Sequence, residues 1–159
     1  MQVLDKKIMN EKLQNKLFKK FPKLFARRKL DKTESCMYWG IDCGDGWYDL
    51  MYLLCSEVQE KADELGVNFC FEQVKEKFGA LVIYMYRDEK TKDYNKYAHE
   101  ILSKYKKLSL EVCEETGGKG QLCKSSFRNL KTLNLTVATL LGYRPVNGDL
   151  RSEDHLNNE

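Results

Sequence analysis

The stretch VNFCFEQVKEKFGALVIYMYR (residues 67–87) decides the fold class expected of this chain. Its two runs rich in aromatic and β-branched residues, VNFCFEQV and ALVIYMYR, flank the short segment KEKFG. Such runs around a short glycine-containing connection are typical of a β-hairpin. With strict alternation along the first strand, Phe71 and Val74 would lie on opposite faces of it. We therefore expect a hairpin at the centre of the fold.

Helical periodicity surrounds this hairpin. Apolar residues recur every three or four positions in residues 9–21, in residues 47–65 and again from about residue 92. Asp45 is expected to be the N-cap of the second helix, and Gly66 is expected to end it. A short strand (128–135) and a short helix (136–143) follow. The pattern predicts an α+β fold, with helices packed on a small antiparallel β-sheet built around the central hairpin.

Length and composition indicate one globular domain. The chain has 159 residues, of which 42% are hydrophobic and 32% charged, which suits a folded domain. We expect a single domain over residues 1–145 and a flexible tail over residues 146–159. No apolar run is long enough to cross a membrane, and the first residues lack the apolar core of a signal peptide. The six cysteines show no disulfide spacing. A cytoplasmic chain with reduced thiols is expected.

Positive charge is concentrated near the N-terminus. Residues 1–33 contain eleven Lys or Arg and three Asp or Glu, a local charge of +8 in a chain whose net charge is +3. This basic N-terminal helix is suited to contact with a nucleic acid or an acidic protein surface. The alternative is a solvated helix face, which we favour because no aromatic residues are interleaved with the lysines on the polar side.

Two motifs carry a resemblance to a known family. CGDGWYDLMYLLC (residues 43–55) and EQVKEKFGALVIY (residues 72–84) resemble the C-G-D-G-W-aromatic-D-L and Q-V-K-E-K-F-G-x-L motifs of a family of small bacteriophage and prophage proteins. The match extends over most of residues 17–145. It implies the fold and a phage context rather than a reaction.

Many members of that family continue with a zinc knuckle, and this chain departs from it. Cys113 stands at the first ligand position, whereas Thr116, Asn134 and Val137 stand where the other ligands are expected. A tetrahedral zinc site needs four nitrogen or sulfur donors. Only Cys113 and Cys123 remain as donors, so the resemblance implies a degenerate knuckle, and we expect neither metal nor cofactor.

Catalytic signatures are weak. His99 has no identifiable nucleophile or carboxylate partner in the sequence, and a surface histidine explains it more simply. Asp42, Asp45 and Asp49 could bind a divalent cation, but a helix cap and a first-turn acid account for two of them. No P-loop, dinucleotide-binding or nucleophile-elbow motif is present. An enzyme is not supported, and binding is favoured.

The two motifs predict one ligand-binding set. Glycines at the start of a helix expose N–H donors toward an anion, and a tryptophan provides a stacking plane. Cations and a tyrosine on the hairpin could converge on the same nucleotide. The alternative is that Trp47 is core and both lysines are solvated. The candidate ligand-binding residues are Gly44, Asp45, Gly46, Trp47, Lys75, Lys77 and Tyr84.

Two functions of different classes follow. The first is a phage-type counter-defence protein that sequesters a nucleotide immune signal without cleaving it, a strategy suited to a small homo-oligomer. The second is an interaction protein that inhibits a host defence nuclease or effector by direct binding. Nucleic-acid binding is a weaker alternative. A concave pocket with cations and aromatics would favour the first, and a flat apolar patch beside the basic helix the second.

Overall fold

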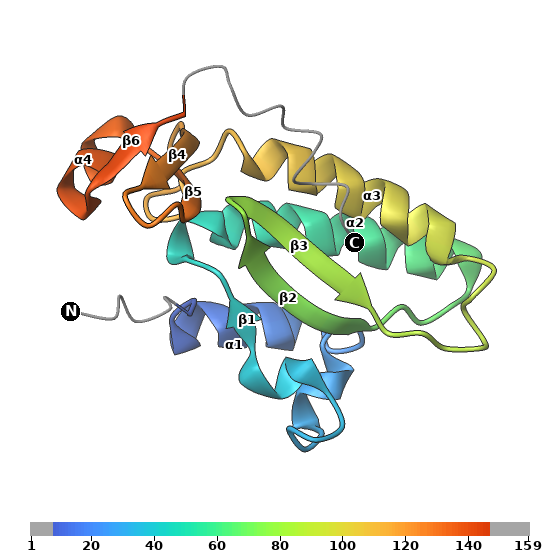
Figure 1. Cartoon of the computed structure of the whole chain (residues 1–159). Helices are drawn as coiled ribbons and strands as arrows, with labels where there is room; N and C mark the ends of the chain where they lie inside the picture. The colour runs from blue at the N-terminus through green and yellow to red at the C-terminus, as the bar shows by residue number, and fades with distance from the viewer. Residues whose placement is uncertain (1–7, 147–159) are drawn as a thin grey trace.

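The computed structural model describes residues 8–146, and the expected tail lies outside them except for Val146. The fold is α+β, as predicted, with its elements arranged as in Figure 1. The helices are α1 (Glu11–Lys20), α2 (Tyr48–Leu65), α3 (Asn95–Ser109) and α4 (Leu135–Leu141). The strands are β1 (Ile41–Asp42), β2 (Phe71–Lys77), β3 (Ala80–Met85), β4 (Gln121–Ser125), β5 (Leu130–Leu133) and β6 (Tyr143–Pro145).

The central hairpin is confirmed. β2 and β3 are antiparallel and pair from Phe71 with Met85 to Lys77 with Ala80. The two turn residues, Phe78 and Gly79, have φ of 52° and 84°. Positive φ at both central positions is the geometry of a type I′ turn, whose twist matches that of the flanking strands.

The first sheet is mixed, whereas a purely antiparallel sheet was expected. Its order is β1-β2-β3, and β1 runs parallel to β2 with Ile41 opposite Val74. Parallel neighbours require a long crossover connection. Here α2 makes the crossover between β1 and β2.

The face assignment along β2 was also wrong. Phe71 and Val74 are both buried in the same core, although they are three positions apart, which strict alternation would place on opposite faces. The register of β2 against β3 shifts between Phe71 and Gln73. An extra residue in one strand is a β-bulge, and it reverses the alternation of faces beyond it.

Most of the core lies between the first sheet and the helices that cover it. α2 and α3 run side by side along one face of the hairpin (Figure 1). The N-terminal segment adds Leu17, Phe21 and Phe25 to the same core, and the Phe25 ring meets the Phe71 ring edge-on with centroids 5.4 Å apart. α1 is thus a docked helix with its lysines outside.

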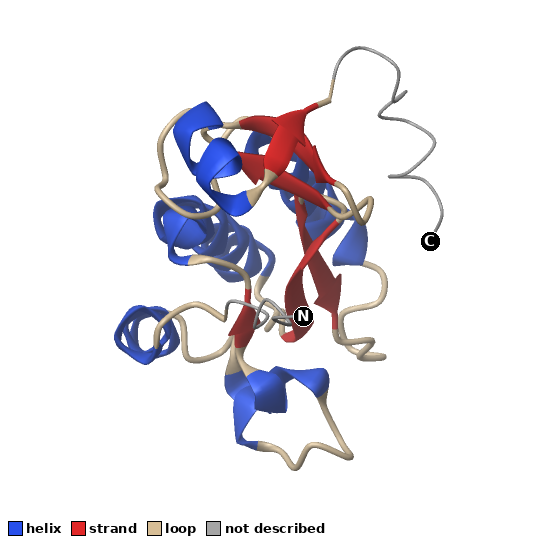
Figure 2. Cartoon of the chain, turned by 60° about the vertical axis from the view of Figure 1, so that its left-hand side comes forward, coloured by secondary structure: helices blue, strands red, loops and turns tan. Residues whose placement is uncertain are grey.

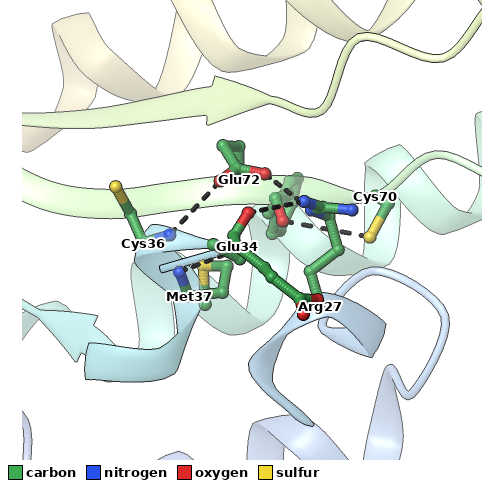
Figure 3. A network of polar contacts seen from close by, with 8 residues as sticks. Arg27, Glu34, Cys36, Met37, Cys70 and Glu72 are labelled. Carbon is green, nitrogen blue, oxygen red and sulfur yellow. Dashed lines mark hydrogen bonds and ion pairs between the residues drawn. The ribbon is translucent and has the colours of Figure 1, made fainter. Parts of the chain in front are cut away.

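A polar network attaches the segment after α1 to β2 (Figure 3). The Arg27 guanidinium lies 2.6 Å from the Glu72 carboxylate and donates to the Glu34 carbonyl at 3.0 Å. Glu72 also accepts from the Cys36 amide at 3.2 Å. Arg27 further stacks 3.8 Å from the centroid of the Tyr86 ring. These contacts fix residues 26–39 against the sheet.

A second, smaller core follows α3. β4 is the middle strand of a sheet with the order β5-β4-β6, and α4 packs beside it (Figure 2). The expected late strand and helix are present as β5 and α4. The buried residues of this cluster are Cys113, Cys123, Leu133, Ala138 and Tyr143. Within residues 8–146 there is no helix long and apolar enough to span a membrane.

Candidate functional site

The predicted glycine turn lies at the junction of the two cores. The Gly46 amide donates to the Glu114 carbonyl at 2.7 Å. A Cβ at Gly44 would lie 2.5 Å from the Glu114 carbonyl oxygen, and one at Gly46 would lie 2.3 Å from the Cys113 carbonyl oxygen. Only glycine permits this approach of two backbones. The turn therefore packs closely against the backbone of the segment that contains Cys113 and Glu114.

The other groups of this turn also serve the fold. Asp45 is not the expected N-cap of α2, because its carboxylate accepts from the Asn10 amide at 2.8 Å and from the Asn10 side chain at 2.9 Å. Trp47 is fully buried, and its indole N–H donates to the Val112 carbonyl at 2.8 Å. The Trp47 amide donates to Gly44. The Gly46 and Trp47 amides and the buried Trp47 ring are thus used within the fold, and these contacts do not favour the predicted phosphate and stacking site at residues 44–47.

The hairpin residues of the predicted set do come together. Lys75 lies opposite Val82 and Gln73 lies opposite Tyr84, so Lys75 and Tyr84 are diagonal neighbours on one face. The Lys75 Nζ is 5.2 Å from the centroid of the Tyr84 ring. Lys77 lies next along the same face, and its Nζ is 5.9 Å from the centroid of the Phe78 ring. Lys75, Lys77 and Tyr84 form what we call the hairpin face.

A cavity of about 400 Å³ adjoins this face at Tyr84. It lies where β3 ends and α3 begins. Tyr84 belongs to both the hairpin face and the cavity, because it is one of the lining residues and the Lys75 Nζ lies over its ring. The lining residues are Ile83, Tyr84, Met85, Arg87, Asp88, Glu89, Lys92, Asn95 and His99.

Local hydrogen bonds hold the loop that closes the cavity. The Tyr86 amide donates to the Cys70 carbonyl at 2.8 Å, which fixes the loop to the strand side. The Asp88 carboxylate accepts from the Lys90 amide at 2.9 Å, and the Thr91 amide donates to the Asp88 carbonyl at 3.0 Å. Arg87 stands exposed between these anchors. The loop therefore presents a guanidinium at the cavity rim from an ordered backbone.

Charge in the cavity wall is mixed. Lys92 pairs with Glu89 at 2.9 Å on the exposed side, and Asp88 is engaged in its own turn. Arg87 and the nearby Lys75 are then the cations best placed to meet an anion beside Tyr84. Sequence reasoning missed Arg87, because the loop between β3 and α3 carries no periodicity, and it also missed Asn95, the first residue of α3. It placed His99 on the surface, and His99 is exposed but lines this cavity.

A buried ion pair lies at the junction of the two cores. Glu114 is 1% exposed, and its Oε1 is 3.0 Å from the Lys131 Nζ. Burial raises the pKa of Glu114 to about 6, although the Lys131 charge opposes that shift. Among the described residues, the Glu114 Oε2 has no hydrogen-bond partner. The nearby Glu76 carboxylate also raises the pKa of Glu114. This carboxyl therefore titrates at about pH 6.

The four positions that correspond to the zinc knuckle lie in or beside the small core. Burial opposes ionisation of the Cys113 thiol, but hydrogen bonds from Thr116 and Asn134 outweigh it and lower its pKa. The Asn134 side chain accepts from the Thr136 amide at 2.9 Å as the N-cap of α4. Val137 packs against the apolar cluster. In residues 8–146, no three His, Cys, Asp or Glu side chains are grouped to hold a metal ion.

Comparison with known proteins yields no match. No family model, curated protein or solved structure matches the chain. The resemblance to phage proteins therefore rests on the two sequence motifs. The geometry described above defines the candidate site: the Tyr84 ring, the Lys75 and Arg87 cations, and the cavity between β3 and α3.

Proposed function

We propose that the chain is a phage-type counter-defence protein that binds an anionic nucleotide signal and sequesters it without cleaving it. The observation that supports this proposal is at Tyr84, which is one of the residues that line a cavity of about 400 Å³ and which has the Lys75 Nζ 5.2 Å from the centroid of its ring. Volumes of about 300–1,000 Å³ are usual for small-molecule sites. The sequestering role rests on the phage resemblance. A protein with this role would act in the host cytoplasm.

Each group has a distinct role in the proposed complex. Tyr84 stacks on the base, because aromatic rings pack on nucleobases whatever the base. Lys75 and Arg87 contact phosphate oxygens, and Arg87 provides a planar fork of donors suited to that geometry. His99 and the Asn95 amide complete the polar wall. The arrangement supports binding of a mononucleotide or of one half of a larger nucleotide.

A second candidate function is inhibition of a host defence nuclease or effector by direct binding. The exposed side of α1 favours it, because four lysines lie along one arc of this helix. Such a stripe would contact an acidic protein surface, or, in the weaker alternative, a nucleic acid. It lies away from β4, β5 and β6 (Figure 1). The lysines are Lys12, Lys16, Lys19 and Lys20.

Calorimetry with a panel of cyclic and linear nucleotides tests the first function. We expect Lys75→Gln and Arg87→Gln each to weaken binding by about tenfold or more, since a hydrogen bond to a charged group contributes about 1.5–3 kcal/mol. Lys90→Gln is the matched control, because Lys90 is an exposed cation of the same loop that does not line the cavity. Mass spectrometry should recover the nucleotide intact.

Two results would reject the first function. One is the absence of heat with every nucleotide from a wild type that circular dichroism shows to be folded. The other is an equal loss of affinity in all three variants, which would indicate a general effect of charge. Either result would bring the protein-partner function to first place.

A further inference from the structure

The second sheet and α4 share an exposed apolar cluster at one end. Ser125 lies opposite Tyr143 in the pairing of β4 with β6. The turn after β4 and the end of α4 that leads into β6 therefore lie at the same end of this sheet, where α4 and β6 are side by side (Figure 1). Phe127 in that turn is 77% exposed, and Leu140 and Leu141 are 80% and 40% exposed. Large apolar side chains gathered on a surface mark an interaction site. We call Phe127, Leu140 and Leu141 the apolar tip.

The charges around the apolar tip are positive. Residues 119–146 contain five Lys or Arg and no Asp or Glu. Arg128 belongs to the same turn as Phe127, and Lys124 lies opposite Arg144 across β4 and β6. A surface that fits the tip must therefore offer apolar area together with negative charge. The exposed cations of this stretch are Lys119, Lys124, Arg128 and Arg144.

The exposed side of α2 offers both properties. Leu53 is 55% exposed in the middle of this helix. Asp49 lies four residues before it and Glu60 seven residues after it, so both acids share its side of the helix, and both are exposed. α2 contains five acidic residues and one lysine. One of these acids, Glu57, already pairs with Lys104 at 2.6 Å. We call Asp49, Leu53 and Glu60 the acidic face of α2.

We propose that the apolar tip of one copy of the chain docks on the acidic face of α2 of a second copy. The chain itself thus carries the partner that the charges of the tip require. Phe127 and Leu140 would contact Leu53, while Lys124 and Arg128 meet the two acids. A contact of this size is typical of weak association, and a two-fold dimer would contain it twice.

This self-association goes beyond the proposed nucleotide binding. The cavity at Tyr84 shares no lining residue with the apolar tip or with the acidic face of α2. Failure of one proposal therefore leaves the other in place.

Sedimentation velocity of the full chain at low salt tests the proposal. We expect the sedimentation coefficient of wild type to rise between about 10 µM and about 1 mM protein, as weak contacts require. Lys124→Glu/Arg128→Glu should raise the dissociation constant by about tenfold or more, because like charges then face one another. Asp49→Lys/Glu60→Lys should do the same. An equimolar mixture of the two variants should associate again, because opposite charges then meet in one of the two possible contacts.

Two further variants separate charge from apolar contact. Lys29→Glu/Lys32→Glu is the matched control for charge, because both lysines are exposed and lie outside the two surfaces. It should leave association unchanged. Leu140→Ser should weaken association by about threefold or more through loss of apolar contact. Its control is Leu108→Ser, since Leu108 is also exposed, at 41%, but lies on α3. Circular dichroism and the melting temperature check that each variant is folded.

Four results would overturn the proposal. One is a wild type that stays monomeric at about 1 mM protein, a concentration at which even weak specific contacts are populated. The second is an equal loss of association in the Lys29→Glu/Lys32→Glu control. The third is a mixture of the two charge-reversed variants that does not associate. The fourth is a monomeric wild type that cosediments with vesicles of anionic lipid while Leu140→Ser does not, which would identify a lipid surface as the partner of the tip.

Discussion

Replacing Glu114 by Gln should change how the stability of the protein depends on pH. Glu114 is buried at the junction of the two cores with the Lys131 ammonium at 3.0 Å, and its pKa is raised from 4.5 to about 6. A carboxyl with a raised pKa binds its proton more tightly in the folded state than in the unfolded state. Its contribution therefore favours folding below pH 4.5 and is lost as pH rises through about 6.

The magnitude follows from the two pKa values. One pKa unit corresponds to about 1.4 kcal/mol, so a rise from 4.5 to about 6 corresponds to about 2 kcal/mol at the acid limit. Between about pH 7 and about pH 5, the gain from this group is roughly 1.2 kcal/mol. Lys131 has its pKa raised from 10.5 and changes charge only in alkali. The other titratable groups coupled to Glu114 are Cys43, Glu76, Glu115 and Tyr143.

Urea unfolding followed by circular dichroism measures the effect. Glu114→Gln cannot titrate, so its free energy of unfolding relative to wild type should be higher at about pH 7 than at about pH 5 by roughly 1.2 kcal/mol. Glu111→Gln is the control, because Glu111 is exposed three residues away. A difference from wild type that is equal at both pH values, or that changes in the opposite direction, would show that Glu114 does not titrate as the junction geometry implies.

Two further predictions concern the junction and the small core. Gly46→Ala should lower the free energy of unfolding by about 2 kcal/mol or more, since its Cβ would lie 2.3 Å from the Cys113 carbonyl oxygen. Gly66→Ala, which meets open space at φ +68°, should cost only about 1 kcal/mol in the same urea assay. Incubation with EDTA should leave the melting temperature unchanged, because the Asn134 side chain caps α4 and Val137 packs against the apolar cluster. Stoichiometric zinc by elemental analysis would contradict that prediction.

Local signals were sufficient for several elements of the fold, but not for β4 and β6. The hairpin, the helix that ends at Gly66 and the late strand and helix all follow from runs of a few residues and from glycine positions. The bulge at β2 could not be read in the same way, because Phe71 and Val74 both reach the core only through the pairing with β3. The parallel pairing of β1 likewise depends on Ile41 meeting Val74, residues far apart in the sequence.

The candidate site was predicted only where its residues share one local element. Lys75 and Tyr84 were paired correctly because both belong to the hairpin. The turn at residues 44–47 was assigned to a ligand because the sequence does not show that Glu114, far along the chain, occupies the space in front of Gly46. Arg87 was missed because its loop is positioned by hydrogen bonds to Cys70 and within the loop, which leave no pattern in the sequence.

One chain of hydrogen bonds explains why both motifs contain glycine. The Gly46 amide donates to the Glu114 carbonyl at 2.7 Å, and the Glu114 amide donates to the Thr132 carbonyl at 3.0 Å. The Thr132 hydroxyl then donates to the Gly79 carbonyl at 2.7 Å. Gly46 and Gly79 thus lie at the two ends of this chain of hydrogen bonds. A Cβ at either position would clash with a residue of the second core. Because the motif glycines serve this contact, the proposed ligand recognition is assigned to side chains near them, on the side of the hairpin where Lys75 lies over Tyr84.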